Sequence, residues 1–207
     1  MKKYLILLYL VSAFVFCYAV NTENDILRTV TKPIPLTLLL LSLKPDSEYR
    51  KFIFIGFIFS LAGDLFLLKI INQFILGLAA FLLAHVFYII AFRIRIKTLK
   101  PLSSLPFYLI AAVLAYYFYP YLGNMLIPVL VYIFVIMTMV WRAFLQRNYN
   151  KKAVYAFTGA VLFAISDSNI AFSKFVEDYE YSKIITIILY WFAQFLIAKS
   201  AFTYYEK

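Results

Sequence analysis

The sequence is poor in the residues that bind metals and form covalent crosslinks. It contains one cysteine, Cys17, and one histidine, His85, among 207 residues. A single cysteine excludes an internal disulfide, a zinc ribbon and a cysteine-ligated iron–sulfur cluster. One histidine excludes the histidine-rich zinc sites of many metalloenzymes. We therefore expect chemistry that requires neither a metal nor another cofactor.

Charged residues are also scarce, and apolar residues take their place. Charged residues make up 14% of the chain and apolar residues 65%, whereas a soluble domain carries about 25% charged residues. The apolar residues form blocks of about 15 to 23, and a helix needs roughly 20 to cross the hydrocarbon of a bilayer. The sequence therefore predicts an all-α, polytopic membrane protein that forms a single transmembrane helical domain over residues 1–207.

The apolar blocks predict a bundle of about eight transmembrane helices. We place the spans at residues 4–20, 31–43, 52–69, 74–92, 105–119, 124–145, 154–172 and 182–204. The second span is short and contains Pro33 and Pro35 near its start. Proline lacks a backbone N–H, which costs little at a helix start but prevents regular helix before it. We expect this span to begin irregularly.

The distribution of basic residues predicts how the spans are oriented. With eight spans and a cytoplasmic N-terminus, fifteen basic residues lie in inner segments: Lys2, Lys3, Lys44, Arg50, Lys51, Arg93, Arg95, Lys97, Lys100, Arg142, Arg147, Lys151, Lys152, Lys199 and Lys207. Only five lie in outer segments: Arg28, Lys32, Lys69, Lys174 and Lys183. This positive-inside bias predicts a multi-pass protein of the inner cell membrane with both termini cytoplasmic. It also explains the net charge of +10 without a nucleic-acid partner.

The first apolar block has a second interpretation. Met1-Lys2-Lys3 followed by apolar residues also resembles a signal peptide, for which Cys17-Tyr18-Ala19 is a poor cleavage site. We expect the segment to be retained, because the charge asymmetry requires it as a span.

Two acidic residues lie inside predicted spans, Asp64 and Asp167. The other eight of the ten acidic residues lie in loops or in the tail. A carboxylate in hydrocarbon costs about 2.5–3.5 kcal/mol or more, so such residues usually have a function. Each aspartate is about five residues from the outer end of its predicted span, and both spans run outward. We therefore predict that both carboxyls lie at one depth and form the catalytic pair.

Other polar residues in the spans are candidates for binding or orienting a substrate. Gly56, Ser60 and Asp64 recur every four residues, which places a small and polar stripe on one helix face. The candidates are Lys32, His85, Tyr88, Tyr132, Asn169, Tyr190 and Gln194. Each also has a structural interpretation, as a satisfied core residue, an interfacial tyrosine or a snorkelling lysine.

Several segments together resemble the YhhN-like family of integral-membrane lysoplasmalogenases. They are Lys32-Pro33, SLAGDLFLL from Ser60, FILGLAAFLLAHVFY from Phe74, PVLVY from Pro128, GAVLFAISDSNIAF from Gly159 and YWFAQ from Tyr190. The order agrees with the family, over about residues 30–202. The resemblance implies an eight-helix hydrolase that cleaves the vinyl ether bond of lysoplasmalogens, a class of lysophospholipid. The products would be a fatty aldehyde and glycerophospho-ethanolamine or -choline.

The implied reaction agrees with a carboxyl pair. A vinyl ether hydrolyses when an acid protonates its β-carbon and water captures the resulting oxocarbenium ion, much as paired carboxyls act in glycosidases. Burial disfavours the charged form of a carboxyl, and neighbouring carboxyls disfavour ionisation of both. The sequence leaves open which aspartate is the acid, and the oligomeric state. It also leaves two other functions open, a proton-coupled transporter of small molecules and a non-catalytic lipid-binding protein.

Overall fold

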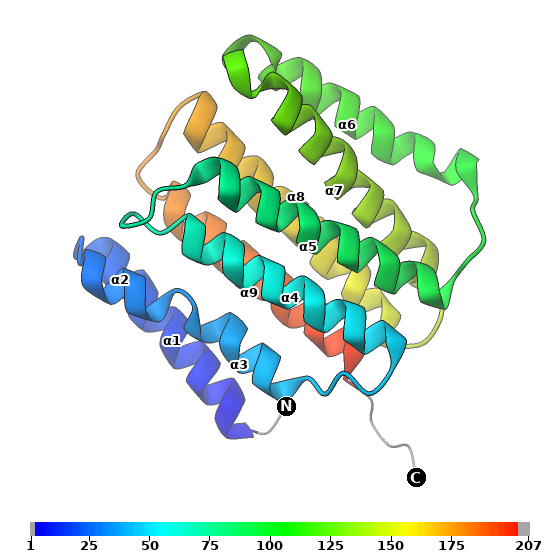
Figure 1. Cartoon of the computed structure of the whole chain (residues 1–207), viewed down its shortest axis with the longest axis horizontal. Coiled ribbons are helices and arrows are strands. Elements are labelled where there is room, and N and C mark those ends of the chain that lie inside the picture. The colour runs from blue at the N-terminus through cyan, green and yellow to red at the C-terminus, as the bar shows by residue number, and fades with distance from the viewer. Residues whose placement is uncertain (1–2, 203–207) are drawn as a thin grey trace.

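The protein consists of helices connected by short turns. The computed structural model describes residues 3–202, and it has no strand within them. The α-helices are α1 (Lys3–Asn21), α2 (Asp25–Thr31), α3 (Ile34–Ser42), α4 (Glu48–Phe66), α5 (Phe74–Arg95), α6 (Leu105–Phe118), α7 (Leu126–Gln146), α8 (Ala153–Phe175) and α9 (Ser182–Ala201). Three short 3-10 helices flank α6: η1 (Pro101–Ser104), η2 (Tyr119–Tyr121) and η3 (Gly123–Met125). Figure 1 shows the helices side by side in one bundle.

Six helical stretches in residues 3–202 are long and apolar enough to cross a membrane. They contain α1, α5, α6, α7, α8 and α9. Exposed apolar side chains such as Phe14 on α1 and Leu109 on α6 suit contact with lipid tails. The protein is therefore an all-α, multi-pass membrane protein, as predicted. The number of eight spans and their orientation stay predictions, and Met1, Lys2 and residues 203–207 lie outside the described residues.

The helix bounds agree closely with the predicted spans, and the differences affect the site. The irregular start of the second span is confirmed, because α2 ends at Thr31 and α3 begins only at Ile34. Asp64 lies two residues before the end of α4, and Asp167 lies eight residues before the end of α8. The prediction of about five residues for both was wrong. Helix length follows backbone hydrogen bonding, which continues through the polar Ser173 and Lys174, so counting from helix ends does not establish one depth.

Five helices form the centre of the bundle. The most extensive contacts join α4 to α5 and α8 to α9, α7 contacts both α5 and α8, and α4 also contacts α9. The segment α1–α3 covers one side of this centre and α6 lies on the opposite side, against α7 (Figure 1). Residues on α4, α5, α7, α8 and α9 therefore face one another in the interior.

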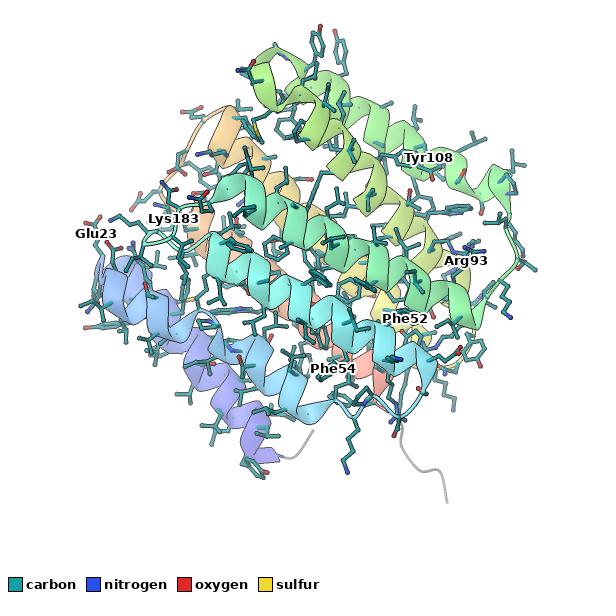
Figure 2. The ribbon with its side chains drawn as sticks, in the orientation of Figure 1. Glu23, Phe52, Phe54, Arg93, Tyr108 and Lys183 are labelled. Carbon is teal, nitrogen blue, oxygen red and sulfur yellow. The ribbon has the colours of Figure 1, made fainter. Side chains whose placement is uncertain are left out.

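The two ends of the bundle carry different connections. Figure 2 shows Glu23 and Lys183 at one end, called the site end below, and Arg93 at the opposite end. At the site end, Arg28 donates hydrogen bonds from Nε to the Ala19 carbonyl (3.1 Å) and from Nη2 to the Val20 carbonyl (2.7 Å). These carbonyls end α1 and lack partners within their helix. Arg28 thereby fixes the start of α2 against the end of α1.

Two glycines allow the central helices to approach closely. A Cβ atom on Gly56 of α4 would lie 2.3 Å from the Tyr88 ring of α5, and one on Gly159 of α8 would lie 2.8 Å from the Ala193 carbonyl of α9. Both distances are shorter than real carbon contacts, so a larger residue would separate the helices. The small and polar stripe of α4 that contains Gly56 thus includes a point of close contact with α5.

Candidate active site

Asp64 lies in a buried cluster close to the end of α4. Its side chain is 3% exposed. The hydroxyl of Tyr190, from α9, donates a hydrogen bond to Asp64 Oδ2 at 2.8 Å. Lys32 Nζ lies 3.8 Å from Asp64 Oδ1 and 3.3 Å from the Asp64 backbone carbonyl oxygen. Both carboxyl oxygens of Asp64 thus have a donor or a cation beside them, which suits an ionised carboxylate.

The break between α2 and α3 places Lys32 beside this cluster. Asn24 caps α2 by accepting a hydrogen bond from the Leu27 N–H at 3.0 Å, and α2 lasts only to Thr31. Pro33 follows and α3 begins at Ile34, so Lys32 stands at the interruption. Interrupted helices are found in membrane proteins where the chain is buried or lines a cavity. The structure thus brings Lys32 and Asp64 together, 32 residues apart in sequence.

Asp167 on α8 has a different environment. Its side chain is 9% exposed, and Tyr132 of α7 donates a hydrogen bond to Asp167 Oδ2. His85 Nε2, from α5, lies 3.7 Å from the same oxygen. Within the described residues no lysine or arginine lies within ion-pair distance of Asp167, and Oδ1 has no hydrogen-bond partner. The two aspartates therefore differ in what neutralises their charge.

Aromatic rings join the two carboxyl clusters. The ring centroid of Phe163 lies 4.7 Å from that of His85, beside Asp167, and 5.3 Å from that of Tyr190, which donates to Asp64. Phe81 packs against both Phe163 and Tyr190, with centroids 6.1 and 5.7 Å apart. The two carboxyl clusters thus meet at the Phe163 ring, which contacts a partner of each aspartate. They therefore belong to one interior site with apolar walls.

A polar network lies beside the carboxyls on α4, α5 and α9. The Tyr88 hydroxyl donates to Gln194 Oε1 at 2.9 Å and lies 3.3 Å from Ser60 Oγ. Gln194 Nε2 and both ring nitrogens of His85 are buried without a hydrogen-bond partner in the described part of the chain. Buried polar atoms without partners in proteins are commonly satisfied by water or by a ligand. These atoms are therefore suited to hold water near the carboxyls.

An apolar cavity ends at Asp167. It has a volume of about 60 Å³ and lies among α5, α6, α7 and α8. Apolar side chains such as Leu78, Ile133 and Met137 line it, together with Tyr132 and Asp167. The apolar lining of this small cavity suits a short alkyl segment, which would lie next to one carboxyl.

A polar pocket opens at the site end and adjoins the apolar cavity. Its volume is about 430 Å³. Its wall includes residues of α1, α2, α8 and α9, and the two spaces share Leu67, Phe74 and Ile170. Lys32 lines the polar pocket and contacts Asp64, whereas Asp167 lines the apolar cavity. The candidate site therefore joins the polar pocket, with its charged residues, to the apolar cavity.

Comparison with known proteins agrees with this geometry. The family model of the YhhN family matches residues 27–201. The chain belongs to the YhhN family. The matched segment contains the carboxyl clusters, the network of Tyr88 and Gln194, and most of the polar pocket. The YhhN-like resemblance seen in the sequence is thereby confirmed.

Relatives in the YhhN family comparison include mammalian and mycobacterial proteins. Lysoplasmalogenase TMEM86A of Bos taurus is 34% identical over 156 residues, which cover 72% of this chain and 64% of that protein. Lysoplasmalogenase TMEM86B of Rattus norvegicus is 32% identical over 174 residues, covering 80% and 68%. A lysoplasmalogenase of Mycobacterium tuberculosis is 34% identical over 142 residues, covering 64% and 53%. The chain thus spans less than two thirds of the length of TMEM86A. No solved structure matches the chain.

Most of the predicted binding residues gather around the carboxyls of this YhhN protein, and one does not. Lys32, His85, Tyr132 and Tyr190 contact the aspartates directly, and Tyr88 and Gln194 form the adjoining network. Asn169 instead links α8 to α9: its amide donates to the Ser182 carbonyl oxygen at 3.0 Å and to Thr186 Oγ1 at 2.8 Å. A role in substrate binding for Asn169 stays a prediction without a contact that supports it.

Sequence reasoning missed the charged residues of the polar pocket apart from Lys32. Lys174, Asp178 and Lys183 lie in or beside the connection between α8 and α9. Lys174 and Asp178 fall between two predicted spans and Lys183 at the start of the last one, where charged residues are ordinary. The available signal was that Lys174 and Lys183 are two of only five basic residues on the predicted outer side.

Proposed function

We propose that this protein hydrolyses the vinyl ether bond of lysoplasmalogens, releasing a fatty aldehyde and a glycerophospho-headgroup. One observation carries the proposal: Asp167 lines an apolar cavity, Lys32, which pairs with Asp64, lines a charged pocket, and the two spaces share part of their wall. A lysoplasmalogen has one alkenyl chain, one polar headgroup and the scissile bond between them. The names of the relatives, lysoplasmalogenase, support this choice of substrate.

Asp167 is suited to be the general acid. It lines the apolar cavity and lacks a cationic lysine or arginine partner among the described residues. An apolar wall favours the neutral carboxylic acid. Tyr132 donates to Oδ2, which leaves Oδ1 to carry the proton. In the proposed reaction this proton moves to the β-carbon of the vinyl ether, and the α-carbon becomes an oxocarbenium ion.

Asp64 is suited to be the base and the electrostatic partner. Lys32 and Tyr190 both stabilise its ionised form. Its negative charge stabilises the oxocarbenium ion, and it takes one proton from the water that attacks the α-carbon. The hemiacetal then collapses: Asp64 returns a proton to the glycerol oxygen and Asp167 takes the hydroxyl proton. Both carboxyls regain their starting states, and one water has been consumed.

Aldehyde release from purified protein tests the proposal. The substrate is a vinyl-ether lysolipid, and its alkyl-ether and acyl analogues are the controls. We expect aldehyde only from the vinyl ether, because only a vinyl ether forms an oxocarbenium ion on carbon protonation. Cleavage of the acyl analogue alone would make the protein a lysophospholipase instead. Absence of aldehyde from protein that binds the alkyl-ether analogue would favour a non-catalytic lipid-binding protein.

An apolar layer argues against the proton-coupled transporter. Phe57 and Phe92 are fully buried. The Phe92 ring lies 6.4 Å from Tyr88 on the carboxyl side and 6.4 Å from Tyr49 towards the opposite end. A proton-coupled transporter requires polar groups that continue to both sides of the membrane. Aromatic side chains fill that route here. We therefore prefer the hydrolase, with its site open at one end, and we propose the inner cell membrane as its location from the positive-inside bias.

A further inference from the structure

The polar pocket contains charges of both signs. Five basic side chains line it: Arg28, Lys32, Lys69, Lys174 and Lys183. Two acidic side chains, Asp25 and Asp178, lie among them. A pocket for a simple anion needs no carboxylate, and carboxylates near an anion site weaken binding. The mixture is suited to a ligand that is itself zwitterionic.

Some of these charges are already paired within the protein. Asp25 accepts from Lys69 Nζ at 2.5 Å and from Arg28 Nη1 at 3.1 Å. Lys32 pairs with Asp64. These pairs form the part of the wall next to α1 and α2, and their charges are largely compensated. The remaining charged groups are those of α8, α9 and their connection.

Asp178 is the acidic residue of the pocket that has no ion pair within 4 Å among the described residues. The hydroxyls of Ser173 and Ser182 donate hydrogen bonds to Asp178 Oδ1. These hydrogen bonds lower the pKa of Asp178, so the group is a carboxylate at neutral pH. None of the described side chains donates to its second oxygen, Oδ2. The nearby Lys183 and the Tyr179 backbone N–H also favour the charged form of Asp178. Its carboxylate is therefore available to a cationic or N–H-bearing ligand group.

Lys174 and Lys183 lie on the same side of the pocket. Lys174 Nζ is 5.3 Å from the centroid of Phe74, which also lines the apolar cavity. Lys183 lies at the site end, in the wall that contains Asp178 (Figure 2). A ligand phosphate near Phe74 would therefore meet the Lys174 ammonium, and Lys183 supplies a second ammonium in the wall of the same pocket.

We propose that the polar pocket is a headgroup site selective for glycerophosphoethanolamine, in which Lys174 and Lys183 bind the phosphate and Asp178 binds the primary ammonium. The inference rests on the proposed function for the orientation of the lipid, and it names the headgroup that this function leaves open. The shared residues Leu67, Phe74 and Ile170 then mark where headgroup and chain meet.

The pocket favours ethanolamine over choline for two reasons. A primary ammonium donates three hydrogen bonds, and the Asp178 carboxylate is an acceptor. A quaternary ammonium has no N–H and is recognised by cages of aromatic faces. The pocket has only Phe16 and Phe74 as aromatic residues in its described wall, and Lys174 already lies over Phe74.

Equilibrium binding of lipids that resist hydrolysis tests the proposal. The full chain in detergent is titrated with 1-O-alkyl-glycero-3-phosphoethanolamine, the matching phosphocholine and 1-O-alkylglycerol. We expect the ethanolamine lipid to bind about tenfold more tightly than the choline lipid, because one charge-assisted hydrogen bond is worth about that factor. We expect alkylglycerol to bind most weakly. Equal affinity for all three lipids would overturn the proposal.

Variants assign the effects to residues. Asp178→Asn should remove the preference for ethanolamine and leave choline binding within about twofold, whereas Asp178→Glu should keep part of the preference. Lys174→Gln combined with Lys183→Gln should weaken both phospholipids about tenfold or more and leave alkylglycerol unchanged. Lys51→Gln is the matched control, since Lys51 is an exposed lysine of α4 that does not line the pocket. A preference that survives Asp178→Asn would overturn the role of Asp178.

Two further comparisons distinguish a failure of the headgroup proposal from a failure of the proposed hydrolysis. Soluble glycerophosphoethanolamine should compete at least 100-fold more weakly than the lipid, because it has no chain to enter the apolar cavity. Equal competition would mean that the pocket binds a soluble metabolite, and it would overturn the lipid site. The binding assay does not require cleavage. Headgroup selectivity without aldehyde release would refute the proposed hydrolysis and keep the headgroup site, whereas aldehyde release without selectivity would refute only the headgroup site.

Discussion

The two buried aspartates have the same side chain in different surroundings. Asp64 lies at the end of α4 with Lys32 and Tyr190 on its two oxygens. Asp167 lies within α8, accepts a hydrogen bond from Tyr132, and faces an apolar cavity without a lysine or arginine partner in the described residues. Paired carboxyls take opposite roles when their environments favour different protonation states. In the proposed mechanism, the neighbours of each aspartate therefore determine which one is the acid and which one is the base.

The largest expected effect is the loss of either carboxyl. Asp167→Asn and Asp64→Asn should each lower kcat for aldehyde release by about 1000-fold, within the range of general acid–base contributions. The double variant should be little worse than either single variant, because the two groups act as one unit. Aldehyde release is measured by a coupled reduction, and binding of the alkyl-ether lysolipid controls for folding. Full activity in a well-folded single variant would refute the two-carboxyl mechanism.

Removing the cation beside Asp64 tests the difference between the two aspartates directly. Lys32→Gln should lower kcat by about 10- to 100-fold, since the Asp64 carboxylate would lose its nearby cation in a buried site. Lys69→Gln, at an exposed position of the same pocket, should change kcat by less than about twofold. Equal losses in both variants would indicate a general effect of pocket charge instead.

The tyrosine partners offer a matched pair of smaller changes. Tyr190→Phe removes the donor to Asp64, and Tyr132→Phe removes the donor to Asp167. Each should lower kcat by about tenfold, which is the value of one hydrogen bond to a charged or reacting group. Determination of kcat and KM separately checks this. A change confined to KM would show that the hydroxyls only shape the binding space.

The smallest effect on catalysis is expected from the packing of α4 against α5 at Gly56. Gly56→Ala should destabilise the protein by about 1–3 kcal/mol, because the added methyl group would overlap the Tyr88 ring. Thermal unfolding in detergent measures the change. Val113→Ile adds a methylene at an exposed position of α6 and serves as the control. Equal stability of both variants would mean that α4 and α5 tolerate separation.

The sequence predicts the helices better than it predicts their ends. Apolar blocks locate the helices within a few residues, because the bilayer requires a minimum apolar length. Pro33 and Pro35 correctly indicate the irregular second span. The predicted distance of five residues from each aspartate to the end of its helix was wrong. α4 ends at Phe66, closer to Asp64 than predicted, and α8 continues past Asp167 through polar residues that an apolar pattern excludes.

The site could be predicted in part, and the limit has a physical cause. A buried charge is costly wherever it occurs, so Asp64 and Asp167 are evident from the sequence alone. Asp178 is an ordinary loop residue until the turn between α8 and α9 brings it to the pocket. Asn169 illustrates the opposite case, since a polar residue near the aspartates in sequence joins two helices, and its role in substrate binding stays a prediction. Only the fold distinguishes these cases.

The shared wall of Leu67, Phe74 and Ile170 has a consequence for product release. In the proposed reaction the bond breaks where the apolar cavity meets the polar pocket. The aldehyde is then left in the apolar cavity and the glycerophospho-headgroup in the polar pocket. The aldehyde can diffuse laterally into the bilayer, while the glycerophospho-headgroup leaves through the polar pocket into water. The products thus partition into separate phases and have no common exit. Accumulated aldehyde in the membrane would then compete with the substrate's chain but not with its headgroup.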